Sequence, residues 1–481
     1  MMHKKTQLIL FSFLILIISY FTYFRNYSYP PNLFWDENYH IASAQKYLNG
    51  VFFMEPHPPL GKMFIAIGEY ILHPNDQIDT SSFLTADYIK DIPQGYSFKG
   101  VRFFPTFFAF LSTLLFFLIL YILSHKPALS FLFTSVYLFE NAIIVHSRGA
   151  MLEGTQIFFI LLFLLYFFWL VSSSLHKNTF PSYVVLGLLY GAVISIKLNG
   201  AILGLILIIL LVWEYHKTIR WSEIIVKIAL FVLASIIVFV NVYCLHFILA
   251  KSPLEERYSQ ASDVYRALLK RGRSSNPATF PLQLGEHLGF ISHYEKGVPK
   301  YDACKPGENG SLPVAWPFGN KSINYRWERD GESVRYLYLQ GNPMIWLIGI
   351  MGIFFAVNLV VSHLAFKTPI KNKRLFFCIL SFVLLYIIYM GAMLSLERVM
   401  YLYHYFIPLI LSLILAFMML EYLFEEKLKK NNTKFYVAVL IIFGFVVAVY
   451  IFFSPLTYYY PLSKSAFQLR NWLPWWGLEP V

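Results

Sequence analysis

The sequence has few charged residues for its length. Charged residues make up 14% of its 481 positions, whereas soluble domains carry about 25%. Hydrophobic residues make up 57%, and a soluble core cannot bury that much apolar surface. The scarcity of charge therefore excludes a soluble protein and predicts a polytopic membrane protein whose excess apolar surface faces lipid.

Cysteine is also scarce, with only Cys244, Cys304 and Cys378 present. Two of them fall inside hydrophobic segments, which excludes a disulfide framework. The sequence contains no P-loop, no GxGxxG turn leading into a βαβ unit, no HExxH helix and no Cys/His metal spacing. We therefore expect no soluble nucleotide-sugar domain, no metal site and no cofactor, and a requirement for a divalent metal stays open.

The net charge of +12 would suggest a nucleic-acid partner in a soluble protein. Here the basic residues gather in short loops between hydrophobic segments. In a membrane protein such loops set the orientation of the spans. We therefore expect the lipid bilayer, and no nucleic acid, as the partner of this basic charge.

The hydrophobic segments predict an all-α polytopic fold with about eleven transmembrane helices, because a span needs about 20 mostly apolar residues. The expected spans are 7–24, 101–123, 127–145, 156–173, 181–197, 199–213, 224–249, 343–363, 374–394, 402–424 and 434–453.

The distribution of basic residues predicts how these spans are oriented. With eleven spans, the basic ends and loops all fall on one side, which the positive-inside rule assigns to the cytoplasm. These basic segments are 2–5, 124–127, 176–178, 216–220, 366–374 and 425–434. The N-terminus is then cytoplasmic, and the C-terminus lies outside together with the long loops 25–100 and 250–342.

Three parts follow from this pattern. Residues 1–249 form an N-terminal transmembrane module that includes the first outer loop, residues 250–342 form a large outer loop, and residues 343–481 form a C-terminal four-helix region with an outer tail. Runs such as Lys62–Leu72 and Glu255–Leu269 have apolar residues at helical spacing, and we expect these helices to lie in the membrane interface.

The stretch 34–62 concentrates residues that can carry chemistry beside the first span. It holds Asp36 and Glu37, then Glu55 and His57 before a double proline. Two adjacent acids point to different sides of a regular element, so one of them is expected to face a site. An acid that is partly desolvated has a raised pKa, which suits a general base. The alternative is a solvated loop acid.

Basic residues from distant segments are expected on the same outer face. They are Arg102, Arg148, Lys197 and Arg398. Several guanidinium and ammonium groups near acids suit a phosphate headgroup that enters from the bilayer. The alternative role for Lys197 is structural: it would only extend its ammonium group from the span to the membrane interface.

Three further residues are candidates for the same site. Glu140 lies within a predicted span, and an intramembrane acid is a functional candidate by default. Its alternative is a structural ion pair with Arg148 or Arg102. Glu153 opens the fourth span. His404 lies at the outer end of the tenth span, where a histidine is more often a satisfied core residue than a ligand.

The stretch FWDENYHIASAQKYLNGVFFMEPHPPLGK (34–62) resembles the first outer loop of the dolichyl-phosphate-mannose–protein O-mannosyltransferases. That family has an Asp-Glu pair, followed further on by an acid, one residue of any type and His-Pro-Pro-Leu-Gly-Lys. Other segments resemble the family in the same order along the chain. They are GVRFFPTFFA (100–109), ENAIIVHSRGAMLEG (140–154), AVISIKLNG (192–200), WPF…GNPMIWLIG (316–349) and YLYHYFIPL (401–409).

The resemblance implies a C-type glycosyltransferase fold, a mannose donor linked to polyprenyl phosphate, and an acceptor hydroxyl on Ser or Thr of a translocated protein. The family's catalytic acid matches Asp36, which Glu37 accompanies. The positions that the family uses around the donor phosphate and the acceptor match Glu55, His57, Arg148, Glu153, Lys197 and His404.

Two features set this sequence apart from the best-known members. The 250–342 loop is too short for the β-trefoil domain that eukaryotic members insert there, which implies a bacterial-type member in the plasma (inner) membrane. Glu55 and Pro56 stand where the family usually has Asp and Val. Bacterial relatives include enzymes that move other sugars or act on lipid A, so the sugar and the acceptor both stay open.

The expected reaction is an inverting transfer in which Asp36 takes the proton of the acceptor hydroxyl. Arg148 and Lys197, with Arg102, would stabilise the phosphate that leaves. One alternative keeps the donor and sends the sugar to a glycolipid such as lipid A. Another is a transporter of lipid-linked sugars. The charges argue against it because they cluster at one membrane face, whereas transporters bind near the midplane.

Overall fold

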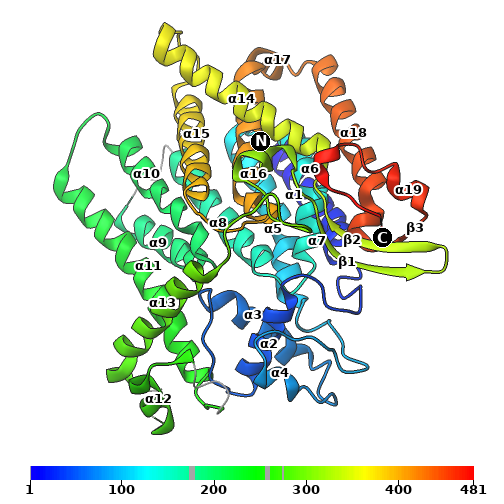
Figure 1. The fold of residues 1–481 in the computed structure, drawn as a ribbon. Coiled ribbons are helices and arrows are strands. Elements are labelled where there is room, and N and C mark those ends of the chain that lie inside the picture. The colour runs from blue at the N-terminus through cyan, green and yellow to red at the C-terminus, as the bar shows by residue number, and fades with distance from the viewer. Residues whose placement is uncertain (1, 173–178, 255–259, 273–275, 481) are drawn as a thin grey trace.

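The computed structural model describes residues 2–172, 179–254, 260–272 and 276–480. It is a bundle of helices, with the helices of the two long loops gathered at its lower end (Figure 1). The helices of the bundle include α1 (Met2–Ser19), α5 (Phe103–Ser124), α8 (Leu152–Ser172), α9 (Phe180–Ile194), α10 (Leu205–Tyr215), α11 (Trp221–Leu249), α14 (Pro343–Phe366), α15 (Lys373–Leu394), α16 (Phe406–Leu423) and α18 (Thr433–Tyr458).

Within the described ranges, nine helices are long and apolar enough to cross a membrane, and a bent pair brings the number to ten. The remaining predicted span corresponds to α9, an apolar helix of 15 residues. The mostly helical, multi-span fold is therefore confirmed, whereas the number eleven stays a prediction. The basic loop 176–178, used to predict orientation, lies outside the described residues.

The bent pair consists of α6 (Pro127–Leu138) and α7 (Asn141–Ser147), which meet at 63°. Glu140 stands at the break as the N-cap of α7, and its carboxylate accepts a hydrogen bond from the backbone N–H of Ile143. Breaking a helix leaves backbone N–H groups without partners, and a capping oxygen satisfies them. The acid that the sequence marks as intramembrane is thus a helix cap.

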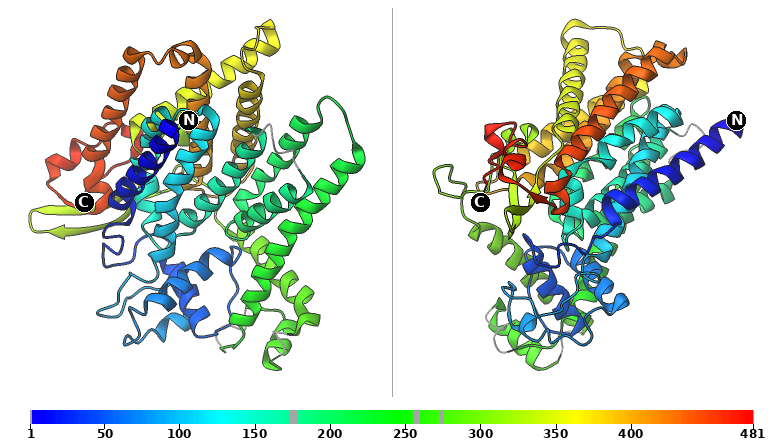
Figure 2. Two further views of the ribbon diagram at one scale, coloured as in Figure 1. Left: turned by 180° about the vertical axis from the view of Figure 1, so that it is seen from behind. Right: turned by 90° about the vertical axis from the view of Figure 1, so that its right-hand side faces the viewer.

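Close helix packing relies on small residues, as expected where helices meet inside a membrane. In α9, a Cβ added to Gly187 would lie 2.3 Å from the carbonyl oxygen of Phe231 in α11. Figure 2 shows α1 along the outside of the bundle, with its N-terminal end pointing away from it. α1 continues into a π-helical turn (Tyr20–Phe24) and packs against α5 and α6.

The segments between the spans build a compact region at the lower end of Figure 1. The first long loop forms α2 (Glu37–Leu48), α3 (Leu60–Leu72) and α4 (Ser82–Thr85). The second forms α12 (Asp263–Lys270) and α13 (Phe280–Gly297). The expected interfacial helix at 62–72 thus starts two residues earlier. The other expected interfacial helix is 255–269. Its residues 255–259 lie outside the described residues, and α12 covers only its later part.

A three-stranded antiparallel sheet completes the fold, in the order β1-β2-β3. β1 (Ile323–Asp330) and β2 (Ser333–Leu339) form a hairpin, and β3 (Pro461–Leu462) from the C-terminal tail pairs with β2. The all-α prediction missed this sheet for two reasons. The second half of β1 is polar and exposed, and the third strand of the sheet, β3, comes from far along the chain.

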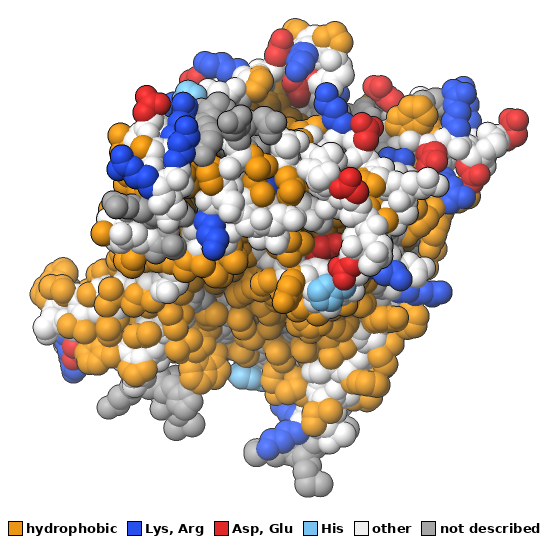
Figure 3. Space-filling model, turned by 90° about the horizontal axis from the view of Figure 1, so that it is seen from below, with side chains coloured by type: hydrophobic (Ala, Val, Ile, Leu, Met, Phe, Trp, Pro, Cys, Tyr) orange, Lys and Arg blue, Asp and Glu red, His pale blue; other side chains and the backbone are white. Residues whose placement is uncertain are grey.

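The surface divides into apolar and charged areas. Seen from below, hydrophobic side chains form a broad band across the lower half of Figure 3, whereas acidic and basic side chains gather in the upper half. Exposed apolar residues on α11, α14 and α18 include Ile225, Phe354 and Phe445. Such surface is costly in water and suits contact with lipid.

Candidate active site

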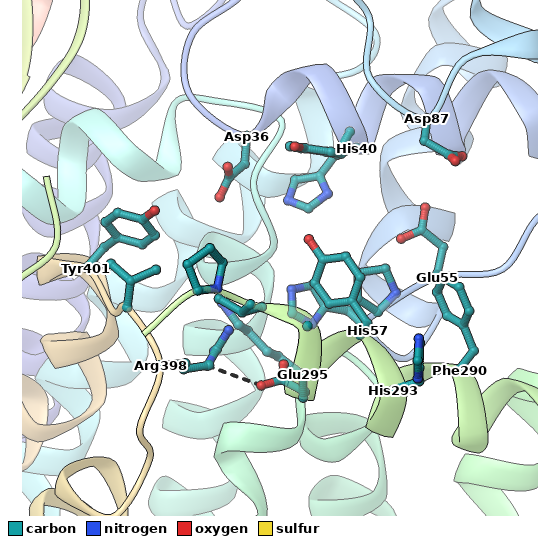
Figure 4. A pocket seen from close by; sticks show the side chains of 18 of the residues that line it. Asp36, His40, Glu55, His57, Asp87, Phe290, His293, Glu295, Arg398 and Tyr401 are labelled. Atoms are coloured by element: carbon teal, nitrogen blue, oxygen red, sulfur yellow. Dashed lines mark ion pairs between the residues drawn. The ribbon is translucent and has the colours of Figure 1, made fainter. Parts of the chain in front are cut away.

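A cavity of about 700 Å³ lies where the two long loops meet the ends of the spans. Its walls come from the start of α2, the segment 54–62, α13 and the residues before α16. Figure 4 shows Asp36 and His40 on one side of the cavity and Arg398 and Glu295 on the other. The charged residues that line it are Asp36, Glu55, Lys62, Asp87, Lys197, Glu295, Lys305, Glu308 and Arg398.

Asp36 is placed by the N-terminus of α2, where it is the N-cap residue. The hydroxyl of Tyr403 donates a hydrogen bond to its Oδ2 at 3.3 Å. Burial raises the pKa of the Asp36 carboxyl, and the charge of Glu153 raises it further. The Lys197 ammonium lowers the same pKa in part, as does the hydrogen bond from Tyr403. A carboxylate with a raised pKa is well suited to accept a proton.

Glu37, the neighbouring acid, points away from the cavity. It is fully buried and pairs with Arg102, whose Nε lies 2.6 Å from its Oε1. The other N–H groups of Arg102 bond Oε2 of Glu37 and the carbonyl oxygens of Ser28, Pro30 and Asn32. All five guanidinium donors are thereby used. The geometry therefore leaves Arg102 no N–H for a donor phosphate, and its role there stays an untested prediction.

Lys197 brings a positive charge to the cavity wall. Its Nζ lies 2.6 Å from Oε1 of Glu153 and 5.2 Å from the centre of the Tyr403 ring. The other oxygen of Glu153 bonds Nε2 of His146 at 2.8 Å, and Nδ1 of His146 bonds the Tyr325 hydroxyl at 2.6 Å. This buried chain of bonds fixes the ammonium group beside Asp36.

The Pro-Pro segment joins the cavity to α3. Glu55 accepts hydrogen bonds from the Ser43 hydroxyl and the Lys62 ammonium. Pro59 is the N-cap of α3, and a Cβ on Gly61 would lie 2.8 Å from the Leu152 side chain. The segment is thus a rigid corner that lets α3 approach α8, as the sequence suggests.

Histidines line the cavity between these groups. His57 and His40 both have a pKa well below the usual value, because burial disfavours the charged form and Lys62 and Lys197 repel it. His404 faces the same cavity, with its ring stacked on Tyr403. The neutral rings can therefore donate and accept hydrogen bonds without adding charge.

The predicted residues divide into two groups. Those that line the cavity are Asp36, Glu55, His57, Lys197, Arg398 and His404, and Glu153 contacts Lys197 directly. Those placed elsewhere are Glu37, Arg102, Glu140 and Arg148. Glu140 accepts hydrogen bonds from the backbone N–H of Asn342 and the indole N–H of Trp346. Arg148 lies in a separate pocket, with Arg25.

Sequence reasoning assigned no role to several residues that shape the cavity. His40 belongs to the stretch 34–62 and lies one turn after Asp36, a spacing that places both on one helix face, so its role could have been found. Tyr403 is one of three tyrosines in 401–405 and Glu295 is one of two acids in α13, so neither gave a signal of its own. Arg398, in contrast, was predicted, and its Nε lies 3.1 Å from Glu295.

The fold and the cavity define the class of protein. A polytopic helical bundle with an acid-bearing cavity between its long loops agrees with the C-type glycosyltransferase architecture that the resemblance implies, and solved structures share this fold. The yeast (S. cerevisiae) protein O-mannosyltransferase Pmt1-Pmt2 complex, in a structure bound to the sugar donor, superposes with a TM-score of 0.81, at 15% identity, over 98% of this chain and 92% of that one. An archaeal oligosaccharyltransferase from Archaeoglobus fulgidus superposes less closely, with a TM-score of 0.52 at 12% identity, over 98% and 58%.

Family models identify the group more closely. The dolichyl-phosphate-mannose-protein mannosyltransferase model matches residues 13–251, and the model of the C-terminal four-helix region of protein O-mannosyltransferases matches residues 297–476. The chain belongs to the protein O-mannosyltransferase family.

Curated relatives match the chain over shorter stretches. Protein O-mannosyl-transferase 2 of Danio rerio is 28% identical over 150 residues, which is 31% of this chain and 19% of that protein. Dolichyl-phosphate-mannose–protein mannosyltransferase 1 of Saccharomyces cerevisiae is 28% identical over 218 residues, which is 42% of this chain and 25% of that protein. The match thus spans a quarter or less of these relatives.

Proposed function

We propose that this protein transfers mannose from a polyprenyl-phosphate donor to Ser or Thr hydroxyls of proteins, with inversion at the anomeric carbon. The observation that carries the proposal is the position of Asp36. It lines the cavity, has a raised pKa and stands near the ammonium of Lys197. Membership of the protein O-mannosyltransferase family supports the sugar and the acceptor.

The proposed step follows from this geometry. The Asp36 carboxylate removes the proton of the acceptor hydroxyl as its oxygen forms a bond to the anomeric carbon. The bond from that carbon to the phosphate oxygen breaks, and its electron pair stays on the phosphate. Lys197 and Arg398 stabilise this developing charge from the cavity wall. Because the leaving phosphate is already a stable anion, the step needs no strong general acid.

The two sides of the cavity suggest how the substrates enter. The spans offer lipid-facing surface for the prenyl chain, whereas α12 and α13 lie on the side away from the bundle (Figure 1). The basic loops support a cytoplasmic N-terminus, with the cavity and the C-terminus on the outer side of the membrane. In the described part of 250–342 the chain forms α12, α13, two short 3-10 helices and the β1-β2 hairpin, with no trefoil domain, which supports a bacterial-type member in the plasma membrane.

The test is transfer of radiolabelled mannose from polyprenyl phosphate, with a Ser/Thr peptide and membrane lipids offered together. Label is expected in the peptide, and Asp36→Asn should abolish transfer while donor binding and the thermal unfolding midpoint change little. The control is Glu397→Gln, which removes a carboxylate that is 79% exposed. Label in lipid alone would indicate a glycolipid acceptor, and near-normal transfer by Asp36→Asn would exclude Asp36 as the base.

A further inference from the structure

A second polar hollow lies at the same end of the bundle as the cavity and shares no residue with it. Its volume is about 320 Å³. It is formed by the end of the first span, the turn after α7 and the end of α18. The residues that line it are Phe21, Arg25, Asn26, Tyr29, Arg148, Tyr450, Ser454, Tyr458 and Tyr460.

Arg148 is the central group of this hollow, and only 5% of it is exposed. Its Nη1 donates to the carbonyl oxygens of Tyr23 and Arg25 at 3.0 and 2.9 Å, and its Nη2 donates to that of Asn26 at 2.7 Å. These bonds use three of the five N–H groups of a guanidinium. They hold the group in place and leave donor capacity for a ligand.

The charge of the hollow has no counterpart in its lining. Arg25 and Arg148 contribute two positive charges, and the nine lining residues include no acid. Carbonyl oxygens and the Tyr458 ring, 5.0 Å from the Arg148 guanidinium carbon, offer only partial negative charge. Charged groups in protein interiors are normally paired. The buried Arg148 guanidinium has no acidic partner among these residues, and the exposed Arg25 adds a second positive charge. The hollow therefore favours a bound anion, and phosphate oxygens suit the guanidinium fork.

The surroundings of the hollow indicate where such an anion comes from. Phe21 on its rim is 53% exposed, and Ile451, which follows the lining residue Tyr450 on α18, is 60% exposed. Exposed apolar side chains on the first span and on α18 suit contact with lipid. Tyr460, which is 52% exposed, adds the amphipathic ring that is typical of the membrane–water boundary. A headgroup phosphate can thus reach both arginines while its acyl chains stay against α1 and α18.

We propose that the Arg25–Arg148 hollow binds the phosphate of an anionic glycerophospholipid of the surrounding bilayer. The Arg148 guanidinium donates its remaining N–H groups to the phosphate oxygens, and Arg25 closes over it from the exposed side. A zwitterionic headgroup fits less well, because its own cation would lie beside two guanidinium groups. This inference is independent of the sugar transferred and of the acceptor.

The experiment titrates phosphatidylglycerol or phosphatidylcholine into the detergent-solubilised protein and follows thermal unfolding by tryptophan fluorescence. Phosphatidylglycerol should raise the midpoint saturably, and phosphatidylcholine should not. Arg25→Gln and Arg148→Gln should each raise the half-saturating phosphatidylglycerol concentration about tenfold or more. Arg25→Gln is the key variant, since Arg25 is exposed and its backbone carbonyl is retained. The control is Lys99→Gln, an exposed cation near the start of α5.

Two results would overturn the proposal. In the first, both arginine variants keep the wild-type dependence on phosphatidylglycerol, so that any lipid effect arises elsewhere. In the second, a short-chain polyprenyl phosphate stabilises the wild type at lower concentration than phosphatidylglycerol and loses that effect in Arg25→Gln. The hollow would then hold the donor phosphate.

Discussion

Glu37 and Arg102 form a fully buried ion pair with two parallel hydrogen bonds, at 2.6 Å from Nε to Oε1 and 2.8 Å from Nη2 to Oε2. Oε1 also accepts the backbone N–H of Ala150 at 2.7 Å, and Oε2 accepts that of Phe34 at 3.1 Å. One carboxylate therefore ties α2 to α5 and to the turn before α8. Its neighbour in sequence, Asp36, is left facing the cavity.

Glu37→Gln should destabilise the protein by about 3–5 kcal/mol, because it leaves the Arg102 charge buried without its partner. The thermal unfolding midpoint in detergent measures this loss. Adding Arg102→Met to Glu37→Gln should destabilise less than the sum of the two single changes. Glu397→Gln, at an exposed pair, should leave the midpoint unchanged. A wild-type midpoint for Glu37→Gln would mean that the pair does not anchor α2.

The contrast between Asp36 and Glu37 shows how far sequence reasoning reaches. Adjacency alone indicates that one of two acids faces a site, and the family resemblance selects Asp36. Adjacency does not reveal the partner of the other acid, since Arg102 also had the charge and membrane face expected of a phosphate ligand. Choosing between those roles requires knowing which groups the five N–H donors of Arg102 contact, and the sequence does not contain that information.

The spans and the sheet show a similar division. Hydrophobic length predicted the helices well, because apolar segments of span length have few other stable forms in lipid. The sequence did not predict the break between α6 and α7 at Glu140, since an acid in an apolar run can equally be an ion-pair partner or a helix cap. Tyr403 approaches Asp36 from 367 positions away. No local pattern encodes a contact of that kind.

Lys197→Gln should lower kcat by about a hundredfold or more, with a smaller change in KM for the acceptor. The ammonium is proposed to stabilise phosphate charge that develops in the transition state, and losing one such group typically has this cost. Single-turnover transfer from polyprenyl-phosphate mannose measures it. Lys305→Gln is the matched control, because Lys305 also lines the cavity but is exposed. Equal losses in both variants would argue for a general field effect and against a specific role of Lys197.

Tyr403→Phe should move the acid limb of the pH–rate profile to higher pH. Burial raises the pKa of Asp36, and the hydrogen bond from Tyr403 partly offsets this by lowering the same pKa. Removing the hydroxyl therefore raises that pKa further. Because the base acts when ionised, activity is lost as the pH falls through this pKa, and in the variant that loss begins at higher pH. Tyr294→Phe, another cavity tyrosine, should leave the limb in place. An unshifted limb in Tyr403→Phe would mean that a different group sets it.

A groove along α13 opens into the cavity, and we expect an extended peptide acceptor to approach along it. It has a volume of about 520 Å³ and shares Met54, Gln260, Phe290 and His293 with the cavity, so the two are continuous. Gly285 and Gly289 lie one helical turn apart in its wall, and a Cβ added to either meets no atom within 4 Å. A side chain added at either glycine would therefore begin in open space and extend into the groove.

Gly285→Leu and Gly289→Leu should each raise KM for a long peptide acceptor about tenfold, because the leucine fills the space that the peptide would occupy. Transfer to a very short Ser/Thr peptide, which needs only the cavity, should change little. The unfolding midpoint should hold or rise, since leucine favours a helix over glycine. Gly444→Leu on α18, also at a position open to a Cβ, is the control and should alter neither KM. If long and short peptides respond alike to Gly289→Leu, the groove does not carry the acceptor, and the chain must reach Asp36 by another path.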